Sequence, residues 1–152
     1  MKLRILTAAA LLSVLAFASP AGADVNLRLG LTDDPDTIFI GVGADIPLTG
    51  GRNGLLVIEP SGDLGLGEFG DRDFFTIRGS ANFKYFIPVG RDAMAYPLGG
   101  VSIYYINFED GGSDSDIGIN LGGGIKFRQF GFELQLGVED VPDLTFLFFF
   151  AI

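Results

Sequence analysis

Few residues in this 152-residue chain could carry out chemistry, since it contains no His, no Cys and no Trp. Without His and Cys there can be no Ser-His or Cys-His nucleophile pair, no imidazole-ligated zinc site and no disulfide. A Ser-Lys pair such as Ser80 and Lys84 remains, but at strand spacing these side chains lie about 13 Å apart. The sequence therefore predicts no catalytic residues and no cofactor.

A run of acids and glycines between residues 109 and 116 could bind a divalent cation, because flexible loops with oxygen ligands suit Ca²⁺. The candidate ligands are Glu109, Asp110, Asp114 and Asp116. Their spacing lacks the Gly and Glu positions of a twelve-residue EF-hand loop. A solvated hairpin loop accounts for the same residues, so no dedicated metal site is predicted.

The N-terminus is typical of a secretory signal peptide. Lys2 and Arg4 precede an apolar run at 5–17, and the small residues that follow suit cleavage by signal peptidase. The apolar run is shorter than the ~20 residues that a membrane-spanning helix needs. We therefore expect a signal peptide at 1–23 and an exported domain at 24–152.

Beyond the signal peptide, apolar and polar residues alternate with a period of two, which predicts β-strands. Eight such segments lie at about 25–32, 37–48, 55–66, 74–88, 96–108, 117–128, 131–139 and 143–152. The segment 96–108 is ambiguous, and there we expect Val101, Ile103 and Tyr105 to point outward and Ser102 and Tyr104 to point inward.

The two faces of these segments differ in chemistry. One face is rich in Leu, Ile and Phe and free of charge. The other face carries both signs of charge, at Arg28, Asp45, Glu59, Asp63, Arg78, Lys84, Lys126 and Glu133. A soluble barrel would place its apolar face inside, whereas strands of about ten residues with an apolar outer face are typical of transmembrane barrels. In lipid only a closed sheet pairs all its backbone groups. The sequence therefore predicts an all-β, eight-stranded, antiparallel up-and-down transmembrane β-barrel.

The interior of such a barrel is only wide enough for its own side chains. Its four basic and four acidic side chains balance, and an unpaired buried charge costs several kcal/mol. We therefore expect a plugged lumen in which these charges pair. Two alternatives stay open. The charges could line a narrow channel for small solutes, or the protein could be a soluble periplasmic β-barrel that binds a small apolar ligand.

The acids are unevenly distributed along the chain. With the N-terminus in the periplasm, the outer loops near 33–36, 67–73, 109–116 and 139–143 hold most of the 19 acids, and the opposite turns hold Arg52, Arg91 and Arg128. Loop carboxylates could share Mg²⁺ or Ca²⁺ with lipopolysaccharide phosphates. The net charge of −9 excludes a nucleic-acid partner, which requires a basic surface.

The last predicted strand is the most specific motif. Its apolar face consists of Leu144, Phe146, Phe148, Phe150 and Ile152. Together with Tyr96–Val101 and Gly118–Gly124, this strand resembles the small eight-stranded outer-membrane β-barrel family, which includes porin-family domains. The family's last strand usually ends in an aromatic residue, whereas this chain ends in Ala151-Ile152.

The resemblance implies a monomer in the outer membrane of a Gram-negative bacterium, in contact with lipid and lipopolysaccharide. It implies that the barrel assembly machinery reads the last strand, so that Leu144 to Ile152 would serve as both assembly signal and lipid face. The implied role is structural or one of surface interaction, without enzymatic activity.

Overall fold

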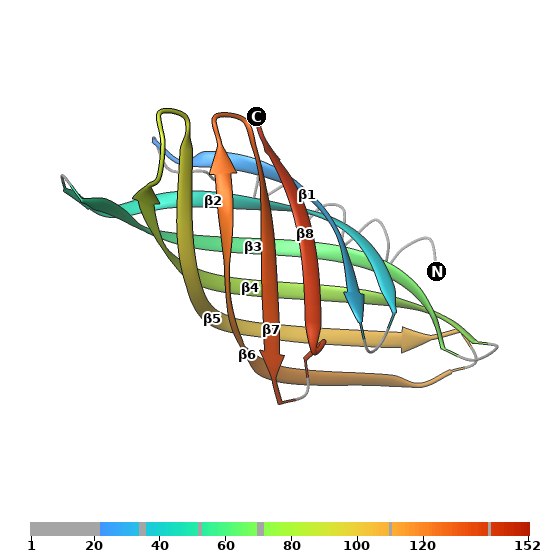
Figure 1. The fold of residues 1–152 in the computed structure, drawn as a ribbon. Helices are drawn as coiled ribbons and strands as arrows, with labels where there is room; N and C mark the ends of the chain where they lie inside the picture. Colours follow the sequence, from blue (N-terminus) through green and yellow to red (C-terminus); the bar gives the residue numbers. More distant parts are fainter. Residues whose placement is uncertain (1–21, 34–35, 52, 70–71, 110, 140) are drawn as a thin grey trace.

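The computed structural model describes residues 22–33, 36–51, 53–69, 72–109, 111–139 and 141–152. They form a closed barrel in which each strand pairs antiparallel with the next and β8 pairs with β1 (Figure 1). The strands are β1 (Asp24–Asp33), β2 (Thr37–Gly51), β3 (Gly54–Phe69), β4 (Arg72–Pro88), β5 (Ala93–Phe108), β6 (Ser113–Phe127), β7 (Phe130–Val138) and β8 (Leu144–Ala151). The predicted fold class is confirmed. Nearly all of the expected signal peptide, residues 1–21, lies outside the described residues.

The alternation of side chains gives each strand two distinct faces. On β2, Ile38 and Ile40 point outward and are 63% and 62% exposed. On β5, the ambiguous segment has the expected sense, because Ser102 and Tyr104 are buried inside while Ile103 is exposed outside. Within the described residues, no helix has the length and hydrophobicity needed to cross a membrane.

The strands differ in length, and this corrects the predicted loop boundaries. β3 to β6 have 15 to 17 residues, whereas β7 and β8 have 9 and 8. Acids expected in loops, including Glu68 and Asp73, instead face each other across the β3–β4 ladder. Asp114 and Asp116 belong to β6, because β5 and β6 stay paired almost up to Gly111, which turns the chain with a φ of 87°.

The barrel has two ends that the lumen connects. The turn end carries the β2–β3, β4–β5 and β6–β7 connections, and the C-terminus lies at the same end beside the β6–β7 connection (Figure 1). The loop end carries the other four connections. Since β4 runs from the loop end to the turn end, Arg78 lies nearer the loop end and Lys84 nearer the turn end.

Apolar side chains also fill part of the interior. Phe86, Tyr96, Leu147 and Phe149 are each at most 2% exposed and belong to one cluster. They share the inward face with the charged residues, so the lumen is packed with rings as well as charges. The sequence interpretation described the inner face by its charges and was incomplete in this respect.

Candidate functional site

The eight charged residues assigned to the lumen all point inward and are at most 5% exposed. They come from β1, β2, β3, β4, β6 and β7, and each has the inward parity of its strand. The structure brings all of them together in one network of ion pairs.

The loop-end part of the network centres on Asp63. Asp63 and Arg78 are direct partners across the β3–β4 ladder, and Arg78 Nη2 lies 2.8 Å from Asp63 Oδ2. Arg28 contacts the other oxygen of Asp63 through Nε at 3.3 Å, and its Nη1 donates to Glu59 Oε1 at 2.8 Å. Asp63 therefore has two guanidinium partners, and Arg28 links this part of the lumen to the rest.

The turn-end part centres on Lys84. Its Nζ lies 2.7 Å from Glu59 Oε2, 2.8 Å from Glu133 Oε2 and 3.9 Å from Asp45 Oδ1. Lys126 donates to the other oxygen of Asp45 at 2.9 Å. With the Arg28–Glu59 contact, these pairs form a continuous chain of alternating charges along the lumen.

Tyr96 belongs to this site and was not identified from the sequence. Its hydroxyl donates to Glu133 Oε2 at 2.7 Å, and its ring lies 5.0 Å from Lys84 Nζ. The Phe149 ring also faces this ammonium group, with its centroid 5.4 Å from Lys84 Nζ. Tyr96 and Ser102 lie an even number of residues apart on β5, so the inward assignment of Ser102 already implied that Tyr96 points into the lumen.

Neutral polar side chains fill the wall formed by β4, β5 and β6. Ser80 and Ser102 share a hydrogen bond of 2.7 Å between their hydroxyl groups. The Asn120 amide donates to Ser102 at 2.5 Å and to Asn82 Oδ1 at 3.2 Å. This cluster of hydroxyl and amide groups carries no charge, and it lies on the same strands β4 and β6 that supply Arg78, Lys84 and Lys126 to the ion-pair network.

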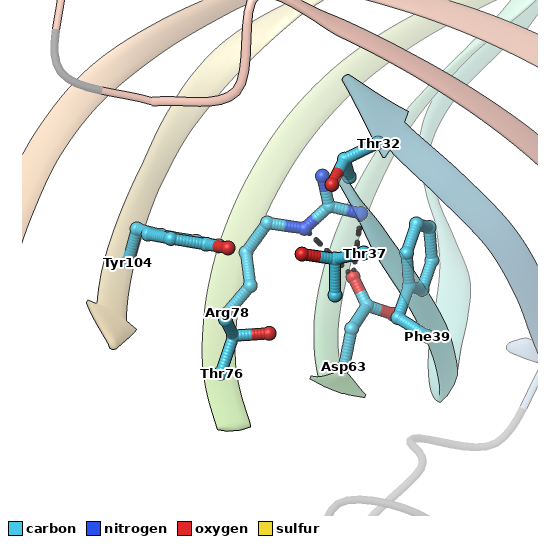
Figure 2. A pocket seen from close by; sticks show the side chains of 7 residues that line it. All are labelled: Thr32, Thr37, Phe39, Asp63, Thr76, Arg78 and Tyr104. Atoms are coloured by element: carbon cyan, nitrogen blue, oxygen red, sulfur yellow. Dashed lines mark hydrogen bonds and ion pairs between the residues drawn. The ribbon is translucent and has the colours of Figure 1, made fainter. Parts of the chain in front are cut away.

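A small pocket opens near the loop end, lined by Thr32, Thr37, Phe39, Asp63, Thr76, Arg78 and Tyr104 (Figure 2). Figure 2 shows the Arg78 guanidinium held against the Asp63 carboxylate beside the threonine side chains. The cavity volume is about 10 Å³. A single water needs about this much space, so the pocket cannot take an organic solute.

The candidate cation ligands that the structure describes, Glu109, Asp114 and Asp116, do not form a group that could hold a metal ion. Glu109 and Asp114 are exposed, and Asp110 lies outside the described residues. No group of three or more acidic side chains comes together for a metal ion anywhere in the described part of the chain.

The last strand presents its expected apolar face to the outside. Leu144, Phe146, Phe150 and Ile152 are 37 to 71% exposed, and Phe148 is half-buried. Phe148 packs against Phe132 of β7 with ring centroids 5.4 Å apart. The outer surface of β7 and β8 is therefore apolar and aromatic.

Comparison with known proteins identifies the fold. No protein-family model and no curated protein sequence matches the chain. The structure is similar to that of the outer membrane enzyme PagL, with a TM-score of 0.56 and 17% identity, covering 85% of this chain and 98% of that chain.

Two further barrels are similar. The N-terminal β-barrel domain of Pseudomonas aeruginosa OprF has a TM-score of 0.55 and 14% identity, covering 86% of this chain and 96% of that one. Ail, the attachment invasion locus protein of Yersinia pestis, has a TM-score of 0.50 and 12% identity, covering 85% and 91%. The chain therefore has the fold of the small eight-stranded outer-membrane β-barrels.

Proposed function

We propose that this protein is an integral outer-membrane barrel with a closed lumen and a structural or surface-interaction role. The observation that carries the proposal is the orientation of the two faces of the sheet, with the apolar face outside and the charged face inside. Large apolar side chains such as Leu66, which is 72% exposed, cover the outside, while the charges pair inside. In water such an extensive apolar surface would cause aggregation, whereas a bilayer covers it.

The lumen favours this role over that of a channel. A solute crossing the barrel would have to separate Lys84 from Glu59 and Glu133, which hold it at 2.7 and 2.8 Å. Breaking a buried pair leaves uncompensated charge and costs about 3–5 kcal/mol. The soluble alternative needs an apolar interior for its ligand, but here the lumen is packed with ion pairs and rings.

The lumen also favours a role without catalysis. The one nucleophile pair considered from the sequence is not formed, because the Ser80 hydroxyl bonds to Ser102 while Lys84 bonds to carboxylates. PagL is described as an enzyme, so the fold itself is compatible with catalysis. The proposal therefore rests on this chain's own side chains and on its lack of His.

At the loop end, we propose contact with lipopolysaccharide. The loop end is rich in acids such as Asp33 and Glu68, and divalent cations would link such carboxylates to lipid phosphates. The apolar face of β8 would be read by the assembly machinery, and the barrel would act as a monomer.

Heat-modifiable gel mobility of the protein in an isolated outer-membrane fraction tests the location. We expect the unboiled and boiled samples to migrate differently, as a detergent-resistant barrel does. A soluble periplasmic protein without a mobility shift would overturn the proposal. Planar-bilayer recording then tests the closed lumen, for which we expect no defined unitary conductance.

Substitution of Phe148 tests which face meets lipid. We expect Phe148→Asp to abolish accumulation in the outer membrane, because a carboxylate on the lipid face is destabilising, while Phe148→Leu accumulates normally. Normal outer-membrane levels of Phe148→Asp would contradict the outward orientation of this face.

A further inference from the structure

The apolar outer face is much taller on one side of the barrel than on the other. On β4 it extends from Phe75 to Ile87, and on β1 only from Val25 to Leu31. At ~3.3 Å per residue and a tilt of ~45°, these spans are about 28 Å and about 14 Å tall. The faces of β7 and β8 give about 19 Å by the same reasoning.

Charged residues fix the loop-end limit of the shorter side. On β1 the next outward residue after Leu31 is Asp33, which is exposed. Asp143 directly precedes β8, and Glu139 directly follows β7. Because a carboxylate on the lipid face is costly, the hydrocarbon has to end before these residues.

The ends of β8 lack residues that could extend the shorter side. Long basic or amphipathic side chains at the ends of a short face can reach the interface, and the exposed Arg128 before β7 is such a side chain, but it is paired with Asp92. The outward ends of β8 are Leu144 and Ile152. The taller side differs, since Tyr85 and Tyr105 stand near its two ends. Stacked rings such as Phe132 and Phe146 add area to the shorter side without adding height.

A tilt of the whole barrel cannot remove this difference. Tilting raises one side relative to the other but leaves the height of each apolar face unchanged. A typical outer-membrane apolar band is about 25 Å tall, which suits β4 but exceeds the faces of β7, β8 and β1. A face shorter than the local hydrocarbon is accommodated by thinning of the bilayer or by association with other proteins.

We propose that the face formed by β7, β8 and β1, here called the seam face, holds the surrounding bilayer thinner than it is around β4 and β5. The inference rests on the proposed membrane location. Its partner is lipid, because the exposed Asp33 and Asp143 interrupt the apolar surface that a neighbouring barrel would need over the full thickness of the membrane. The protein would thus impose an asymmetric thickness profile on its lipid shell.

Tryptophan substitution provides the test, because the chain has no Trp of its own. Leu31→Trp reports the loop-end limit of the seam face, and Phe75→Trp reports the same limit on β4. Val101→Trp lies away from both ends of β5 and is the control for a Trp deep in the hydrocarbon. Each full-length variant is refolded into phosphatidylcholine vesicles whose acyl chains carry bromine at either a shallow or a deep position.

We expect shallow bromines to quench Leu31→Trp and Phe75→Trp more than deep bromines do, and the reverse for Val101→Trp. If deep bromines quench Leu31→Trp as strongly as Val101→Trp, the bilayer keeps its thickness at the seam face and the proposal is wrong. If neither lipid quenches Leu31→Trp while Val101→Trp responds, protein covers the seam face, which also overturns it. Absence of quenching in all three variants would instead refute the membrane location.

A second pair of variants tests the same inference through folding. Asp33→Leu lengthens the seam face, whereas Asp73→Leu lengthens the face of β4, which is already tall. In long-chain vesicles we expect Asp33→Leu to raise the folded fraction and Asp73→Leu to leave it unchanged. Equal responses of the two variants would contradict a mismatch confined to the seam face.

Discussion

The two halves of the lumen stabilise their buried charges with different partners. In the turn-end half, Lys84 lies between two carboxylates and against the rings of Tyr96 and Phe149. In the loop-end half, Arg78 contacts Asp63 and the Thr145 hydroxyl beside a cavity large enough for one water. Both halves place a cation over a ring, because Arg78 lies 4.6 Å from the Phe39 ring, but the loop-end half adds hydroxyl groups and the small cavity.

The two halves differ in whether a buried carboxylate depends on a single cationic partner. Glu59 has both Lys84 and Arg28 as partners, but Lys84 is the one cation paired with Glu133 among the described residues, so its loss leaves the buried Glu133 carboxylate without a cation. Asp63 has two guanidinium partners and hydroxyl groups nearby, so the loss of Arg78 leaves Arg28 in place. We therefore expect substitutions in the turn-end half to cost more than equivalent ones in the loop-end half.

The largest effect is expected for Lys84→Met, which removes the shared ammonium while keeping the side chain's length. We expect a loss of about 3–5 kcal/mol in the free energy of unfolding, because the buried Glu133 carboxylate is left without a cationic partner. The folded fraction in unboiled gels, followed against urea in vesicles, measures it. The double variant Lys84→Met/Glu133→Gln should recover part of the loss, and unchanged urea resistance of Lys84→Met would show that the pairing is wrong.

Arg78→Met is the matched change in the loop-end half. We expect a loss of about 2 kcal/mol, the cost of hydrogen bonds to a charged group, because Arg28 still neutralises Asp63. The same urea titration measures it. A loss as large as that of Lys84→Met would erase the distinction between the halves.

The packing of the turn-end half can be tested without changing a charge. A Cβ at Gly131 would collide with the Phe149 ring and lie 2.6 Å from the Ile125 carbonyl oxygen. We expect Gly131→Ala to cost about 1.5 kcal/mol through overpacking. Gly79→Ala is the control, since nothing lies within 4 Å of its Cβ position, and destabilisation of both variants alike would show that packing is not the cause.

The smallest effect is expected for Thr145→Val, which removes the hydroxyl that accepts from Arg78 Nη1 at 3.2 Å. We expect a loss of about 1 kcal/mol, as for a typical hydrogen bond, because a water in the adjacent cavity can replace the acceptor. Unfolding titrations in the same vesicles measure this loss. A loss above that of Gly131→Ala would mean that no water replaces the hydroxyl as acceptor for Arg78.

Much of the fold could be predicted because strand parity is a local property. Alternation alone placed Ser102 and Tyr104 inside and Ile103 outside, and it marked every strand of the barrel. Parity likewise selected the inward charges, since a charge on the lipid face of a strand is costly.

The pairing partners could not be predicted because they depend on the register between strands. Asp63 and Arg78 face each other through one hairpin, but Lys84 meets Glu133 across the lumen. The contribution of rings was missed for a related reason. Phe149 looks like a lipid-facing residue in a strand of phenylalanines, and only its odd position in β8 places it inside.

The ion-pair chain has a consequence for the timing of biogenesis. Lys126 and Asp45 are separated by 81 positions in the sequence, and Tyr96 and Glu133 by 37. Lys126 on β6 and Asp45 on β2 meet only across the closed lumen, and lipid offers them no substitute partner. The Asp63–Arg78 pair can form within one hairpin, but the pairs across the lumen form only as the first and last strands join, which makes closure a late and cooperative step. A barrel arrested before closure would expose unpaired charges, and these would distinguish it from the closed barrel.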